Sequence, residues 1–163
     1  MILIPLFAAI APFILWPIEI FFPYPHIVEE LTKALLISLL LKSQADTFQV
    51  HSADTWKVTS GYILSPSRWP IVYGSILIGF LFALSETILY MFNINGPQTL
   101  FLRFALTMPM HIITSLVILG LALINKKLIF MGIVAAATIH YYYNLAVASG
   151  GLDFIKFINL VAR

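Results

Sequence analysis

The chain has 163 residues with a net charge of +2, and 61% of them are hydrophobic whereas only 10% are charged. A mean hydropathy of +0.98 excludes an ordinary soluble globular domain, and the small net charge gives no indication of nucleic-acid binding. The absence of cysteine excludes disulfides, thiolate catalysis and cysteine-bound metals. The sequence contains no nucleophile elbow, P-loop or dinucleotide-binding glycine motif.

The chain begins with an apolar segment at about 2–22, which is long enough to cross a bilayer and lacks the basic start of a signal peptide. Pro12 and Pro17 lie inside this segment, and membrane helices tolerate such prolines. A second, shorter span is predicted at about 26–42. A polar stretch at 43–68 follows, and its composition leaves a small hairpin and an interfacial helix both open.

Three further apolar spans are predicted at about 69–92, 98–124 and 128–148, because a bilayer requires roughly 20 such residues. The tail at 152–163 is apolar with few charges and is predicted to form a short interfacial helix. The expected fold is therefore an all-α polytopic membrane bundle of about five transmembrane helices. Residues 1–163 are expected to form a single transmembrane domain.

Basic residues are distributed unequally between the two ends of the predicted helices. The end with the N-terminus carries Lys42, Lys57, Arg68, Lys126 and Lys127. The opposite end carries Arg103, Lys156 and Arg163. Because loops rich in lysine and arginine stay in the cytoplasm, we expect an integral protein of the plasma membrane with a cytoplasmic N-terminus.

Several titratable or amide side chains lie inside the apolar segments. A charged group at the centre of a bilayer costs about 2.5–3.5 kcal/mol, and such residues usually face the bundle interior and serve a function. These candidate site residues are Glu29, Glu30, Lys33, Glu86, His111, His140 and Asn144.

The depths of these residues in the membrane agree. At the helical rise per residue, Glu86 lies about 25 Å and His140 about 20 Å from the cytoplasmic side. His111 lies about 12 Å from the opposite side, and Glu29 is one turn past the bend at Pro23–Pro25. The polar groups of all four spans therefore reach the exoplasmic half of the bundle, which predicts one site there.

Spacing along the helices also favours one site. Glu29 shares a helix face with Lys33, and His140 shares one with Asn144. A polar stripe follows one face of the fourth span and consists of Arg103, Thr107, His111 and Ser115. A carboxylate in such a site can accept a proton from water, while histidine and amide groups can stabilise an oxyanion. His111, His140 and one glutamate also form a His₂Glu set typical of catalytic zinc, so the metal question stays open.

The same residues also have structural interpretations. Glu29 and Glu30 are acids of a kind that helix N-termini favour. Glu86 can pair with Arg103 between helices, and His111 can be a hydrogen-bonded packing residue. Their agreement in depth favours the functional interpretation.

Residues 29–33 (EELTK) resemble the EExxK motif of the PrsW-like intramembrane proteases, and residues 79–86, which end in Glu86, resemble their FxxxE motif. Residues 103–111 and 140–144 resemble the two histidine motifs of that family. The four motifs occur in order on successive predicted spans, between about 27 and 148. PrsW-like proteins are similar to the type II CAAX prenyl endopeptidases and to a non-catalytic subunit of gamma-secretase.

The resemblance implies an intramembrane endopeptidase that cuts membrane-anchored proteins on the exoplasmic side of the lipid bilayer. It implies that Glu29 activates water and that His140 and Asn144 hold the oxyanion. The roles of Glu86 and His111 stay open, because the CAAX enzymes have a histidine where Glu86 stands. No cofactor is expected to be required, with zinc as the alternative. The rival functions are a zinc-dependent metallopeptidase, a non-catalytic scaffold or binding subunit, and a proton-coupled carrier.

Overall fold

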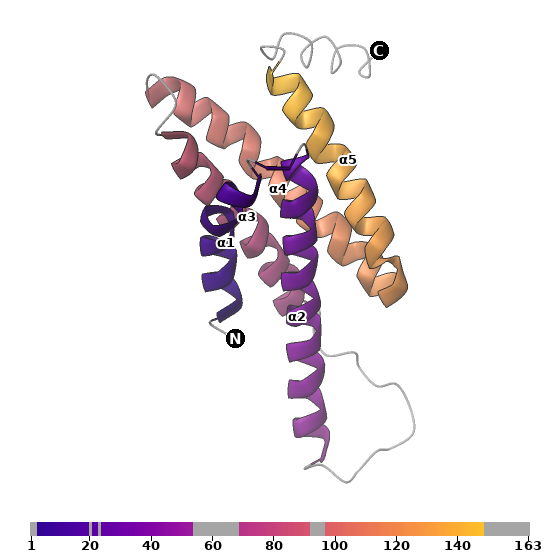
Figure 1. Cartoon of the computed structure of the whole chain (residues 1–163). Coiled ribbons are helices and arrows are strands. Elements are labelled where there is room, and N and C mark those ends of the chain that lie inside the picture. The colour runs from indigo at the N-terminus through magenta and orange to yellow at the C-terminus, as the bar shows by residue number, and fades with distance from the viewer. Residues whose placement is uncertain (1–2, 20, 23, 54–68, 92–96, 149–163) are drawn as a thin grey trace, which may run out of the picture.

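The computed structural model describes residues 3–19, 21–22, 24–53, 69–91 and 97–148 (Figure 1). Within these ranges the chain forms five α-helices and one short 3-10 helix, without any strand. The elements are α1 (Leu3–Glu19), α2 (Pro25–Ala53), α3 (Trp69–Met91), α4 (Pro97–Ile124), η1 (Lys126–Leu128) and α5 (Ile129–Ala148). The expected all-α membrane bundle is therefore confirmed.

Proline marks the start of three helices. Pro25 and Pro97 are the first residues of α2 and α4, and Pro70 is the second residue of α3. The fixed backbone angle of proline suits the first turn, where its missing N–H has no helical partner to lose. In α1, by contrast, Pro12 and Pro17 lie inside the helix, as the sequence predicts.

The second helix is longer than the predicted span. α2 continues past Lys42 and ends at Ala53, so the predicted polar loop does not begin at residue 43. Once a helix is nucleated, each added residue costs little, which allows the polar residues 43–53 to extend it. The remainder of that loop, 54–68, and the predicted interfacial helix at 152–163 lie outside the described residues.

Helix α2 is the centre of the bundle, because it packs against α1, α3, α4 and α5. α4 packs against both α3 and α5, whereas α5 contacts neither α1 nor α3 in the part of the chain that is described. The wholly or almost wholly buried side chains between these helices include Ile37, Ile78, Phe82, Ile118 and Leu119.

The two faces of α2 differ in the way expected of a helix in lipid. Leu31, Leu35 and Leu39 follow one face and are 49%, 59% and 45% exposed. Glu30 and Lys33 face the bundle and are 0% exposed. Charged groups therefore lie inside the protein while leucines cover its outside, which is the reverse of a soluble protein.

Among the described residues, three helical segments are long and apolar enough to cross a membrane: Trp69–Met91, Phe104–Ile124 and Lys126–Val147. α1 adds a shorter apolar helix over Leu3–Ile18. That α1 and α2 also cross, to make about five spans, stays a prediction.

Candidate active site

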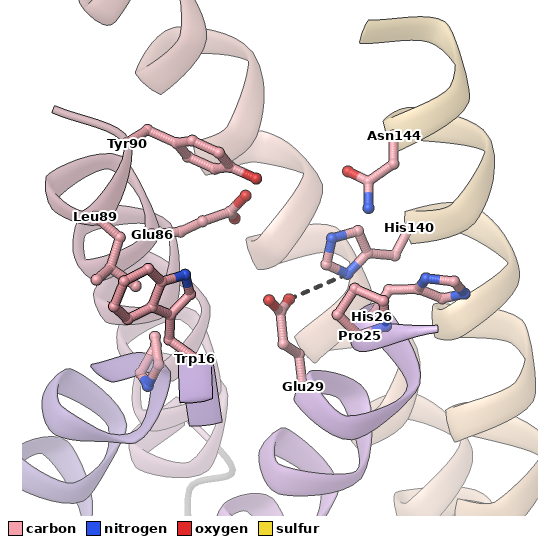
Figure 2. A pocket seen from close by; sticks show the side chains of 10 residues that line it. Trp16, Pro25, His26, Glu29, Glu86, Leu89, Tyr90, His140 and Asn144 are labelled. Atoms are coloured by element: carbon pink, nitrogen blue, oxygen red, sulfur yellow. Dashed lines mark ion pairs between the residues drawn. The ribbon is translucent and has the colours of Figure 1, made fainter. Parts of the chain in front are cut away.

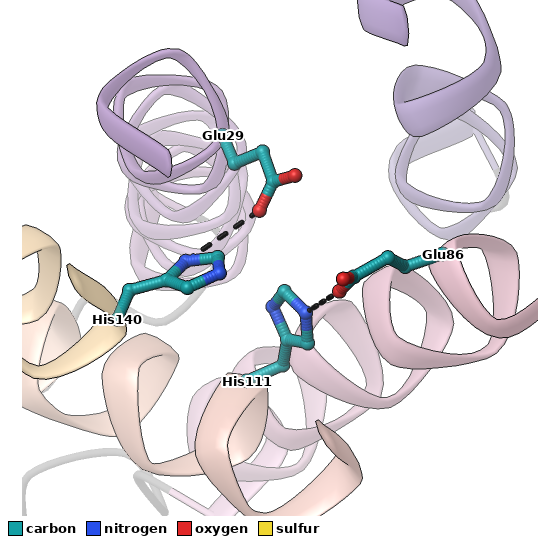
Figure 3. Close-up of side chains that lie close together, drawn as sticks. All are labelled: Glu29, Glu86, His111 and His140. Atoms are coloured by element: carbon teal, nitrogen blue, oxygen red, sulfur yellow. Dashed lines mark hydrogen bonds and ion pairs between the residues drawn. The ribbon is translucent and has the colours of Figure 1, made fainter. Parts of the chain in front are cut away.

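Four titratable side chains from four helices converge inside the bundle (Figure 3). Glu29 comes from α2, Glu86 from α3, His111 from α4 and His140 from α5. One ligand atom of each residue lies within 4.8 Å of the ligand atoms of the other three. We call this group the Glu-His cluster. It consists entirely of residues that the sequence nominates as site residues.

The α2 and α5 side of the cluster contains a buried ion pair. The Nδ1 atom of His140 lies 2.9 Å from Oε1 of Glu30 and 3.5 Å from Oε2 of Glu29. The same Glu30 oxygen lies 2.7 Å from Nζ of Lys33. Because an ionised carboxylate only accepts hydrogen bonds, Nδ1 of His140 carries the hydrogen and Nε2 keeps a lone pair.

The α3 and α4 side of the cluster contains a second pair. Nε2 of His111 lies 2.5 Å from Oε2 of Glu86. Gly79 allows this contact, because a Cβ atom there would lie 2.6 Å from the backbone oxygen of His111 on the facing helix. The sequence offers Arg103 as a structural partner for Glu86, but the side chain of Arg103 lies outside the described residues.

A cavity of about 100 Å³ opens beside the cluster (Figure 2). Glu29, Glu86, His140 and Asn144 form its polar wall, and Trp16 and Leu89 are among its apolar lining residues. Asn144 lies one turn beyond His140 on α5, as Figure 2 shows. The cavity is large enough for a few water molecules and is polar enough to hold them.

The cluster has the charge and the donors that a divalent cation requires. Glu29, Glu30 and Glu86 provide three carboxylates against the single ammonium of Lys33, so two negative charges are uncompensated when all are ionised and both histidines are neutral. The buried Nδ1 atom of His111 has no hydrogen-bond partner among the described residues. Imidazole and carboxylate are ligands that zinc accepts, and ligating histidines typically bind a carboxylate through their other nitrogen.

Sequence reasoning missed several residues of the site. Thr114 binds Lys33 at 3.0 Å, and its position three residues after His111 places it on the same helix face. His26 lines the cavity, and its ring centroid lies 5.9 Å from that of His140. Trp16 and Tyr90 also line the cavity, and no pattern along their own helices indicates this.

The polar stripe predicted on α4 divides between several partners. His111 joins the Glu-His cluster. The Thr107 hydroxyl lies 2.7 Å from the hydroxyl of Tyr143 on α5. Ser115 accepts a hydrogen bond from Ser75 of α3 at 3.1 Å through its backbone oxygen. The stripe therefore holds α4 against α3 and α5 as well as contributing to the cluster.

Comparison with known proteins assigns the family. No curated protein and no solved structure matches the chain. The sequence pattern of the PrsW family of intramembrane metalloproteases matches residues 18–162, a range that contains all the predicted site residues. The match confirms the family resemblance seen in the motifs and indicates a hydrolase. The chain therefore belongs to the PrsW family of intramembrane metalloproteases.

Proposed function

We propose that the chain hydrolyses peptide bonds of membrane-anchored proteins at the Glu-His cluster, and that it uses a divalent metal ion, most simply zinc. The observation that supports this most is the convergence of four ligand atoms within 4.8 Å of one another beside a cavity of about 100 Å³. The description of the family as metalloproteases gives no support to the expectation that no cofactor is required.

We assign metal binding to His111, His140 and Glu86, which form a His₂Glu set with room for a further ligand. A zinc ion in such a set supplies Lewis-acid chemistry and makes water more acidic. We assign the general base to Glu29, as the family resemblance implies, because its carboxylate lines the cavity and lies 3.5 Å from Nδ1 of His140.

In this assignment the residues of the chain have separate tasks. The Glu29 carboxylate lines the cavity and takes a proton from the attacking water. Glu30 holds Nδ1 of His140 and thereby sets the orientation of its ring. Lys33 balances the charge of Glu30 at 2.7 Å. The apolar side chains of Trp16 and Leu89 help to exclude bulk water from the cavity.

The oxyanion assignment changes for one residue. The resemblance implies that His140 and Asn144 both donate to the oxyanion. The Nδ1 hydrogen of His140 is already engaged by Glu30, which leaves the Asn144 amide as the donor at the cavity wall. We therefore propose that Asn144 donates to the carbonyl oxygen of the scissile peptide bond as charge develops on it.

The first test identifies the substrate. Membranes from cells that make wild type or Glu29→Gln at equal abundance would be compared for new termini in single-span proteins. We expect fragments that occur only with wild type and that are cut on the exoplasmic side. Such a fragment supplies the substrate for assays with purified protein.

The second test separates metal binding from proton transfer. Purified wild type should contain stoichiometric zinc, and Glu86→Gln should lose it. Glu29→Gln should keep zinc while kcat falls about 10²- to 10⁴-fold, the usual contribution of a general base. Full activity of metal-free wild type would reject the metal and return the assignment to a purely glutamate-dependent reaction.

A further inference from the structure

Thr114 of α4 connects the two sides of the Glu-His cluster. Its hydroxyl oxygen lies 3.0 Å from Nζ of Lys33 on α2 and 3.1 Å from the backbone oxygen of His111. Thr114 and Lys33 are both 0% exposed. Because neither side chain is accessible to solvent, water does not replace either partner in this hydrogen bond.

The direction of each hydrogen bond follows from the chemistry of the groups. A hydroxyl has one hydrogen, which Thr114 donates to the His111 carbonyl, so its lone pair accepts from the Lys33 ammonium. Lys33 also donates to Oε1 of Glu30 at 2.7 Å. The same oxygen accepts the Nδ1 hydrogen of His140 at 2.9 Å. The result is a continuous series of hydrogen bonds from α4 through α2 to α5.

The Lys33 ammonium group has few alternative positions in this series of hydrogen bonds. Its ammonium lies 5.4 Å from the centre of the Phe82 ring, which favours the cation without fixing its direction. Thr114 and Glu30 both accept hydrogen bonds from Nζ, and these bonds fix its direction. Without the Thr114 oxygen, the ammonium is free to move along the Glu30 carboxylate, and the oxygen that holds His140 moves with it.

We propose that Thr114 is a positioning residue, which sets the orientation of His140 through Lys33 and Glu30. This inference rests on the proposed function for its effect on catalysis, but the orientation of the His140 ring can be tested without any activity. Thr114 lies outside the four family motifs on which the resemblance rests, and its role follows from its contacts alone.

The kinetic test compares three variants of the full-length protein. Thr114→Val keeps the shape and removes the acceptor, and Thr114→Ser keeps the acceptor. Thr87→Val is the matched control, because the buried Thr87 hydroxyl donates to the Ala83 carbonyl of its own helix at 2.7 Å. We expect Thr114→Val to lower kcat or zinc affinity about 10- to 100-fold, as removal of outer partners of metal ligands does.

The pattern across the variants decides the outcome. KM should change little in Thr114→Val, since Thr114 does not line the cavity, and Thr114→Ser should restore the activity. Thr87→Val should match wild type in kcat. Wild-type turnover by Thr114→Val overturns the proposal, and so does a Thr114→Ser variant as impaired as Thr114→Val, because the loss would then come from packing.

NMR of the histidine ring nitrogens separates this inference from the proposed function. His140 should be the Nδ1–H tautomer in wild type and a mixture in Thr114→Val, with the signal assigned by its loss in His140→Asn. That change in a protein that cleaves nothing would reject the proposed function and keep the positioning role. An unchanged His140 tautomer in Thr114→Val would overturn the positioning role even in an active protease.

Discussion

Lys33 and Glu30 form a buried ion pair in which each charge needs the other to be stable inside the protein. Both are 0% exposed and lie 2.7 Å apart. Removing two ions from water costs several kcal/mol each, which their attraction repays only when the remaining hydrogen bonds are also made. Thr114 binds Lys33 and His140 binds Oε1 of Glu30, while Oε2 of Glu30 has no hydrogen-bond partner among the described residues. The pair is therefore tolerated as a unit, and neither charge is tolerated alone.

The Lys33→Met variant tests this dependence. It leaves the Glu30 carboxylate buried without its cation, so we expect the free energy of unfolding to fall by about 3–5 kcal/mol. Denaturant unfolding of the purified protein in detergent measures this change. Adding Glu30→Gln to Lys33→Met should recover most of the loss, because no buried charge remains. A double variant as unstable as Lys33→Met would show that Lys33 stabilises by packing instead.

At the residue scale, the convergence of four polar side chains was predictable from sequence, but their individual partners were not. Depth along each helix places Glu29, Glu86, His111 and His140 at one level. Depth contains no information about rotation around the helix axis, which decides that Glu86 meets His111 and that His140 meets Glu30. The assignments of Glu29 as base and Asn144 as oxyanion donor stay predictions.

Helix ends in the apolar segments were predictable to within a few residues. The expected spans at 69–92 and 98–124 correspond to Trp69–Met91 and Pro97–Ile124, because proline and turn residues mark their limits. The end of α2 was not predictable, since hydropathy falls at Lys42 while the helix continues to Ala53. Hydropathy reports where lipid ends, and a helix need not end there.

The contact between α3 and α4 gives a prediction at the element scale. A Cβ atom at Gly79 would lie 2.6 Å from the His111 oxygen and 2.8 Å from the Cα of Ile112, both in the backbone. Gly79→Ala must therefore push the helices apart. We expect a loss of about 1–3 kcal/mol in stability, the usual cost of overpacking, together with lower activity as Glu86 moves from His111.

Gly120→Ala is the control for this substitution. Gly120 is also on a helix, but a Cβ atom there has nothing within 4 Å. Because alanine favours helix over glycine by up to about 1 kcal/mol, Gly120→Ala should be as stable as wild type or more so. Thermal unfolding and cleavage rates of both variants provide the comparison. Equal stability of Gly79→Ala and wild type would show that α3 and α4 can separate without loss.

At the scale of the whole molecule, the cavity lies toward one end of the bundle. It is lined by Pro25 and His26, at the start of α2, and by Tyr90, near the end of α3. Lys126 and Lys127 lie at the turn between α4 and α5, at the start of η1. Since α5 runs from that turn toward Asn144, the lysines and the cavity are at opposite ends of α5 (Figure 1).

This arrangement links the site to the orientation of the protein in the membrane. If the lysines stay in the cytoplasm, as basic loops do, the cavity opens toward the exoplasmic side.

The chain contains no cysteine, so a single introduced cysteine is the only thiol of the protein that a maleimide can label. Phe21→Cys probes the connection between α1 and α2, where Phe21 is 86% exposed, and Lys127→Cys probes the opposite end. A membrane-impermeant maleimide should label Phe21→Cys on intact cells and label Lys127→Cys only after the cells are opened. The reverse pattern would place the cavity on the cytoplasmic side, and the substrates would then have to present their cleavage sites there.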